Sequence, residues 1–218
     1  MQPTSNEEVM MSDGEALTAV KVVGICGSLR RMSYTRQALS VALQGAQDIG
    51  ATIRLIDLQE YDLIFCDGKE DESNYPEDVF TLRREVREAD GLILGTPEYH
   101  GSFSGVLKNA IDLMGFKEFE AKIIGLVGVA GGTMGAVNAL NGLRVIGRAV
   151  HAWVLPEQVS IPKAREVFDA TGALQDRMIE RRLQELGRQV TRFAYLHSSG
   201  KAREFIEVWE NAPTNPGG

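Results

Sequence analysis

The chain has 218 residues and a formal net charge of -7, with 30 acidic against 23 basic side chains. This acidic balance argues against nucleic-acid binding as the main activity, because phosphate neutralisation requires clustered lysine and arginine. Its hydrophobic content of 44% is enough for one sizeable core, and the length suits one α/β domain with modest tails.

Short apolar runs alternate with longer stretches of helical periodicity along the chain. The runs have strand length and are bounded by turn residues. The second run mixes polar and apolar residues, which places it near a sheet edge. In chain order we expect a strand at 19–26, a helix at 33–50, a strand at 52–58, an irregular stretch at 59–75, a helix at 77–90, a strand at 91–97, a helix at 104–114, a strand at 121–130, a helix at 131–147, a strand at 149–156 and a helix at 174–195.

This alternation predicts an α/β fold, a doubly wound sheet of five parallel strands with helices on both faces. The most apolar runs belong at its centre, where helices cover them on both sides. The strand order 2-1-3-4-5 satisfies these conditions with right-handed crossovers. Ligands of such sheets bind beyond the carboxyl ends of the strands, so the loops after strands one, three and four are the places to search.

We expect three parts: a flexible N-terminal segment at 1–18, one domain at 19–197 and a partly flexible C-terminal extension at 198–218. The N-terminal segment is polar and acidic and lacks the features of a signal peptide, and no apolar stretch has the length of a membrane helix. Cys26 and Cys66 show no metal-ligand or redox spacing, and we expect Cys26 to pack in the core. A cytoplasmic protein without a metal site or a membrane partner is therefore predicted.

The loop after the first strand, GSLRRMSYTR at 27–36, combines hydroxyls and guanidiniums with the start of a helix. Free backbone N–H groups and the helix dipole favour an anion at such a place. The loop lacks the glycine fingerprint of dinucleotide sites and the Gly-Lys-Ser/Thr of a P-loop, so one terminal phosphate suits it best. A capped helix start with exposed arginines explains the same residues equally well.

The loops after strands three and four complete the candidate site. In TPEYHGSFSG, at 96–105, an aromatic side chain stands beside glycines and suits a flat heteroaromatic ring. His100 is a candidate acid or base, although a hydrogen-bonding or structural role is more common for a lone histidine. Gly131 and Gly132 allow close approach of a ligand, or simply form a tight turn. Three suitable loops at neighbouring strand ends favour a ligand site over coincidence.

The motifs GSLRRMSYTR and TPEYHGSFSGVLKNAID, at 27–36 and 96–112, resemble those of the NAD(P)H-dependent FMN reductases, which are flavodoxin-like in fold. The resemblance covers roughly residues 20 to 195. It implies that FMN takes hydride at its N5 atom from NADPH or NADH, and that no protein acid, base or nucleophile is required. It also implies a phosphate site made by Ser28, Arg30, Ser33 and Thr35, ring contacts from Pro97, Glu98, Tyr99 and His100, and a second ring edge at Gly131 and Gly132.

The chain departs from the family pattern at three positions. Thr35 and His100 stand where asparagine is frequent. We expect the first change to alter a phosphate or ribityl contact, and the second to alter substrate preference or flavin tuning. Ser104 stands where proline is frequent, so we expect a looser loop there. None of these changes removes a group that flavin binding requires.

The resemblance leaves the electron acceptor open among free flavins, quinones, azo and nitro compounds, metal oxyanions and organoarsenicals. It also implies a homodimer or homotetramer with flavin sites near the interface. The alternatives are a flavodoxin-like electron carrier, a flavin-binding sensor without turnover, and a Rossmann-type protein in which Asp57 binds a ribose. The missing glycine fingerprint counts against the last of these.

Overall fold

The computed structural model describes residues 20–69 and 71–198. The predicted N-terminal segment and residues 199–218 of the predicted C-terminal extension lie outside these ranges. Within them, no helix is long and apolar enough to cross a membrane. The same residues contain no group of three or more histidine, cysteine, aspartate or glutamate side chains that is arranged to hold a metal ion.

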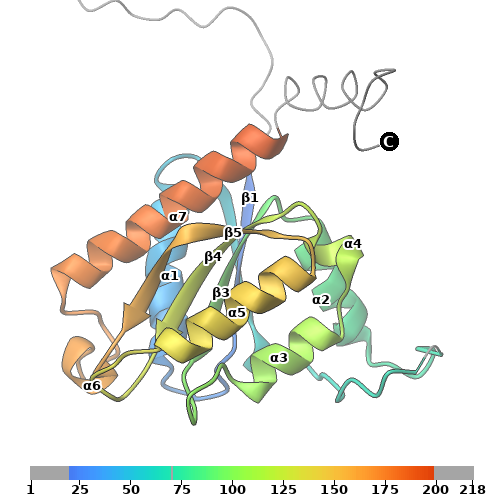
Figure 1. The fold of residues 1–218 in the computed structure, drawn as a ribbon, viewed down its shortest axis with the longest axis horizontal. Helices are drawn as coiled ribbons and strands as arrows, with labels where there is room; N and C mark the ends of the chain where they lie inside the picture. The colour runs from blue at the N-terminus through green and yellow to red at the C-terminus, as the bar shows by residue number, and fades with distance from the viewer. Residues whose placement is uncertain (1–19, 70, 199–218) are drawn as a thin grey trace, which may run out of the picture.

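Five parallel strands form one sheet in the order β2-β1-β3-β4-β5, as the sequence predicts. β3 and β4 are buried along their whole length, whereas β2 is buried only at its carboxyl end. Their carboxyl ends all lie at the lower edge of the molecule in Figure 1. The strands are β1 (Lys21–Cys26), β2 (Thr52–Asp57), β3 (Gly91–Pro97), β4 (Ile123–Val129) and β5 (Trp153–Ile161).

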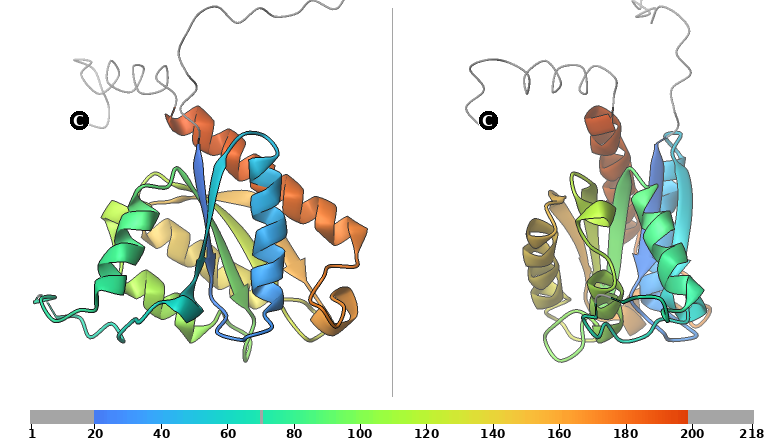
Figure 2. Two further views of the ribbon diagram at one scale, coloured as in Figure 1. Left: turned by 180° about the vertical axis from the view of Figure 1, so that it is seen from behind. Right: turned by 90° about the vertical axis from the view of Figure 1, so that its right-hand side faces the viewer.

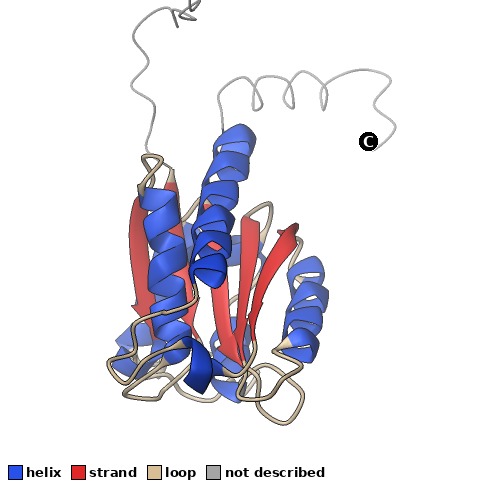
Figure 3. Ribbon diagram, turned by 90° about the vertical axis from the view of Figure 1, so that its left-hand side faces the viewer, coloured by secondary structure: helices blue, strands red, loops and turns tan. Residues whose placement is uncertain are grey.

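Helices cover both faces of the sheet, which confirms the doubly wound architecture. One core cluster joins α1 and α7 to one face, and a second joins α2, α3, α4 and α5 to the other. Figure 2 shows both helical layers with the sheet between them, and Figure 3 shows α1 and α7 side by side. The helices are α1 (Tyr34–Gln47), the 3-10 helix η1 (Leu58–Glu60), α2 (Glu77–Arg87), α3 (Gly105–Asp112), α4 (Phe116–Phe119), α5 (Val137–Ala149), α6 (Ala164–Val167) and α7 (Arg177–Ser198).

The fifth strand lies further along the chain than the sequence predicts. Ala149 ends α5 and His151 adopts a left-handed φ of 59°, so the predicted strand start is a helix end and a turn. The strand then passes through Pro156 to Ile161. Proline has no backbone N–H to donate to a neighbouring strand. Pro156 lies at a break in register opposite β4, on a strand at the sheet edge, so no such bond is required and the strand continues. The prediction of 149–156 is therefore wrong in both limits.

The prediction that Cys26 packs in the core is confirmed. Its side chain is fully buried at the end of β1, and its thiol donates to the Ser28 carbonyl at 3.9 Å. Burial raises the pKa of this thiol above its ordinary value, so it stays protonated near neutral pH.

The contact between α1 and α7 depends on two glycines. A Cβ at Gly187 would lie 1.8 Å from the Ala42 carbonyl oxygen, and one at Gly45 would lie 2.1 Å from the Gln184 carbonyl oxygen. Both obstacles are backbone atoms, which cannot move away without separating the helices. The two helices therefore pack backbone to backbone on this face of the sheet.

Substitution Gly187→Ala is expected to lower the free energy of unfolding by about 1–3 kcal/mol or more, the range for overpacking a filled contact. Gly105→Ala is the matched control, because a Cβ at Gly105 would meet nothing within 4 Å. Urea unfolding followed by circular dichroism measures both variants. Equal stability of the two variants would contradict the close helix contact.

Candidate active site

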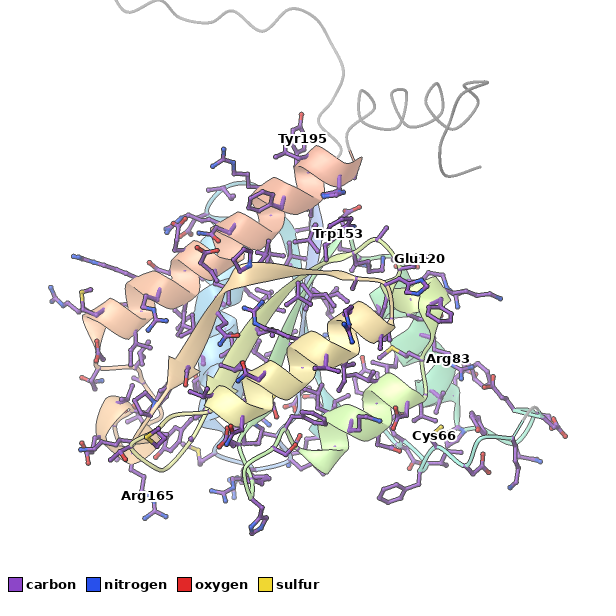
Figure 4. All side chains as sticks on the ribbon, viewed as in Figure 1. Cys66, Arg83, Glu120, Trp153, Arg165 and Tyr195 are labelled. Carbon is purple, nitrogen blue, oxygen red and sulfur yellow. The ribbon has the colours of Figure 1, made fainter. Side chains whose placement is uncertain are left out.

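A cavity of about 400 Å³ opens beyond the carboxyl ends of β1, β3 and β4. All three loops that the sequence singled out contribute to its wall, together with α6. Figure 4 shows Arg165 extending from α6 at this end of the sheet. The lining residues are Ser28, Arg30, Met32, Tyr34, Thr35, Pro97, Glu98, Tyr99, Val129, Ala130, Gly131, Ala164 and Arg165.

Most of the predicted site residues come together in this wall, namely Ser28, Arg30, Thr35, Pro97, Glu98, Tyr99 and Gly131. Three do not line the cavity: Ser33, His100 and Gly132. Each of these has a structural task in the same loops, as its contacts show below.

Ser33 is the N-cap of α1. Its hydroxyl oxygen accepts from the Arg36 N–H at 3.2 Å, which caps the helix. Ser28 is buried and its hydroxyl oxygen accepts from the Arg30 N–H at 3.4 Å. Thr35, also buried, follows in the first turn of the helix. Hydroxyls, a guanidinium and a helix N-terminus therefore meet at one end of the cavity.

His100 lies at the tip of a tight turn. Tyr99 and Ser102 exchange two backbone hydrogen bonds, of 2.9 and 3.1 Å, and the two residues between them have φ of 52° and 76°. These values describe a turn with two left-handed central residues. Histidine, like asparagine, tolerates this conformation better than most side chains do, so His100 suits the turn. The His100 side chain is exposed and Tyr99 faces the cavity.

The Arg30 guanidinium lies 5.6 Å from the centre of the Tyr99 ring. This cation–π contact joins the first loop to the second across the cavity mouth. Because both side chains also line the cavity, the pair combines a positive charge with a flat aromatic surface in one wall.

Ser104 fastens the second loop rather than loosening it. Its hydroxyl donates to the Gly27 carbonyl at 2.6 Å and accepts from the Leu107 N–H at 3.2 Å, so it also caps α3. Its own N–H donates to the buried Thr96 hydroxyl at 2.9 Å. A proline at this position has neither the hydroxyl nor the N–H. These bonds count against the expectation of a looser loop.

Substitution Ser104→Ala is expected to cost roughly 1–3 kcal/mol of stability, because it leaves the Gly27 carbonyl without this partner and removes a helix cap. Ser40→Ala is the control, since the Ser40 hydroxyl also bonds a carbonyl but at the exposed surface of α1. Thermal unfolding of both variants measures the difference. A cost for Ser104→Ala no larger than that of the control would refute the fastening role.

Glu98 connects the second loop to the third. Its carboxylate accepts from the Ala139 N–H at 3.0 Å in the first turn of α5, whose own N-cap residue supplies no side-chain bond. A carboxylate at a helix N-terminus is favourable. The Glu98 N–H also donates to the Val129 carbonyl at 2.8 Å. This glutamate therefore supports the cavity wall from within the protein.

The third loop presents bare backbone. A Cβ built at Gly131 or Gly132 would meet nothing within 4 Å, so protein packing does not require glycine at either position. The Gly132 carbonyl accepts from the Lys163 N–H, and the Ala130 carbonyl accepts from the Ala164 N–H, both at 3.0 Å. These bonds bring α6 to the site.

The predicted site leaves out six residues of the wall, namely Met32, Tyr34, Val129, Ala130, Ala164 and Arg165. Met32 and Tyr34 belong to the first motif but received no role, and the Tyr34 ring stacks on Phe168 at 4.8 Å. Ala164 and Arg165 follow β5, whose predicted position ended too early to place them here. No local sequence signal marks Arg165, because its place depends on the pairing of β5 with β4.

The strand order and the cavity beyond the carboxyl ends of β1, β3 and β4 define a flavodoxin-like protein. Solved structures agree on this fold. A flavoenzyme NAD(P)H:(acceptor) oxidoreductase from Paracoccus denitrificans superposes with a TM-score of 0.67 at 24% identity, covering 82% of this chain and 99% of its own. A flavodoxin from the domain Archaea superposes with a TM-score of 0.57 at 12% identity, covering 80% of this chain and 99% of its own.

The chain belongs to the NADPH-dependent FMN reductase family, whose model matches residues 20–166. It is 37% identical to an NAD(P)H-dependent FMN reductase of Pseudomonas aeruginosa, over 77% of this chain and 93% of the relative. It is 36% identical to an NADPH azoreductase of a Bacillus species, over 64% of this chain and 75% of the relative. The family resemblance predicted from the two motifs is confirmed, and the protein is an FMN-dependent, NAD(P)H-using oxidoreductase.

Proposed function

We propose that the chain binds FMN in the 400 Å³ cavity and catalyses electron transfer from NADPH or NADH to a small acceptor. The observation that carries the proposal is the composition of this one cavity wall. An anion-binding end at α1 adjoins an aromatic side chain and a glycine loop whose open side is not filled by protein. When bound, FMN supplies the two-electron chemistry of the reaction.

Each part of the wall suits one part of FMN. Ser28, Thr35 and Arg30 would donate to the phosphate, and Ser33 contributes by capping the helix whose N-terminus lies at this end of the cavity. Pro97, Glu98 and Tyr99 would hold the ring, Gly131 would allow its second edge to come close, and Gly132 holds the loop through its carbonyl. His100, at the exposed turn tip, affects the flavin only indirectly. The protein thus binds and orients, and none of these side chains moves a proton in the reaction.

The acceptor belongs to the small molecules that an FMN reductase or an azoreductase reduces. The relatives' names favour a free flavin or an azo compound over quinones, nitro compounds and metal oxyanions. An electron carrier or a sensor without turnover is the second candidate, and membership of the reductase family counts against it.

We also propose that the chain forms a homodimer or homotetramer and acts in the cytoplasm. Met134, Val137 and Val145, on α5 and the loop before it, are 83%, 43% and 59% exposed, and such side chains suit contact with a second copy. The acidic composition gives no reason to add a nucleic-acid partner.

The function is tested by reducing the purified, FMN-loaded protein with NADPH or NADH under anaerobic conditions. We expect the visible flavin band to bleach promptly, and the faster donor identifies the preferred nucleotide. Adding an azo dye or free flavin should then restore the band. A bound flavin that stays oxidised would instead support the carrier or sensor.

Arg30→Ala is expected to weaken FMN binding by about 10- to 100-fold, because a charged hydrogen bond to phosphate is worth about 1.5–3 kcal/mol. Arg31→Ala is the matched control, since Arg31 is exposed in the same loop but does not line the cavity. Titration of flavin fluorescence gives both dissociation constants. Unchanged FMN affinity in Arg30→Ala would show that the phosphate lies elsewhere.

A further inference from the structure

The side chain of Arg36 ties the first loop of the site to the end of β2. Its Nε donates to the Asp57 carboxylate at 2.5 Å. One terminal nitrogen donates to the Arg31 carbonyl at 3.0 Å, and the other donates to the Arg30 carbonyl at 3.4 Å and to the Gln59 side chain at 2.9 Å. Of the five N–H donors of a guanidinium, these bonds use four.

Asp57, which anchors the Arg36 side chain, is itself held in place by the protein. The Arg36 and Asp57 side chains are only 19% and 11% exposed. The second carboxylate oxygen of Asp57 accepts from the Gln59 N–H at 3.2 Å, which caps η1. Asp57 is therefore engaged by protein groups on both oxygens, in contrast to the ribose-binding role of the Rossmann alternative.

The bonds to two consecutive carbonyls set the orientation of the loop. In a trans peptide the C=O and the following N–H point in opposite directions. Because the Arg30 and Arg31 carbonyls point toward Arg36, the N–H groups of Arg31 and Met32 point to the other side of the loop. Arg30 and Met32 both line the cavity, so this bracing acts on the segment that forms its anion-binding end.

Arg36 is not among the residues that line the cavity, and its charge is balanced by Asp57 at contact distance. Its effect on an anion in the cavity must therefore pass mainly through the geometry of the loop. A flexible chain of residues 28–33 would have to be ordered when the ligand binds, and that ordering would cost affinity.

We propose that Arg36, anchored by Asp57, is a positioning residue that holds the loop 28–33 ready for the phosphate of the cofactor without touching it. This inference rests on the proposed function, because it assumes that FMN occupies the cavity. It assigns to the pair the selection of the phosphorylated flavin over riboflavin.

The decisive variant is Asp57→Asn, which removes the anchor's charge but keeps its shape. Simple electrostatics predicts tighter FMN binding, because the site becomes more positive. If Arg36 instead positions the loop, FMN binding should weaken, with a dissociation constant on the order of tenfold higher, because Arg36 loses its charged partner. Riboflavin affinity should stay within about twofold, since no phosphate is involved. Arg36→Lys should bind FMN no more tightly than Arg36→Gln, because one ammonium group cannot form the four hydrogen bonds that the Arg36 guanidinium makes.

Arg54→Gln is the matched control, because Arg54 also lies on β2 and pairs with Glu85 at 3.4 Å, away from the loop. Fluorescence titration with FMN and riboflavin, and amide hydrogen exchange of residues 28–33, are measured for every variant. We expect faster exchange in this loop for Asp57→Asn and Arg36→Gln, and unchanged exchange and affinities for Arg54→Gln.

Four results would overturn the inference. Tighter FMN binding by Asp57→Asn or rescue by Arg36→Lys would show that charge alone matters. Equal losses of FMN and riboflavin affinity would show a general structural role. Unchanged amide hydrogen exchange of residues 28–33 in Asp57→Asn and Arg36→Gln would show that Arg36 does not hold the loop in place. If the wild-type chain binds neither FMN nor riboflavin, the proposed function is wrong, and the positioning role of Arg36 fails with it.

Discussion

The close approach of β1, β3 and α3 at Gly27 is the constraint on which the site depends. The Gly27 N–H donates to the Gly95 carbonyl at 2.8 Å, which continues the pairing of the two central strands beyond β1. A Cβ at Gly27 would lie 2.7 Å from that of Leu107 and 2.9 Å from the Ser104 hydroxyl oxygen. Only a residue without a side chain lets the first two loops leave the sheet together and share one wall of the cavity.

The three loops are joined to one another as well as to the sheet. Ser104 binds the first loop, Glu98 binds the start of α5, and the backbone of the third loop binds α6. Arg36 and Asp57 add a link from the first loop to the edge strand β2. A site assembled from separate strand ends gains its rigidity from such cross-links, and a rigid site spends less binding free energy on ordering.

Much of the fold could be predicted because its signals are local. Apolar runs and helical periodicity mark four of the five strands and the long helices, and the acidic chain still shows a cluster of arginines and hydroxyls after β1. The prediction fails where a tertiary contact decides the outcome. Pro156 continues a strand because it lies at a break in register on a sheet edge. The short helix α6 follows β5, and its position depends on the pairing of β5 with β4.

The amino-acid sequence by itself determined the strand order, the family and the three loops that line the cavity, since periodicity and short motifs are properties of neighbouring residues. Only the tertiary structure decided how those residues divide their tasks. Ser104 fastens a loop through a bond to Gly27, more than 70 positions away, and Arg165 reaches the cavity because β5 pairs with β4. Such roles depend on distances in space, which the linear pattern does not contain.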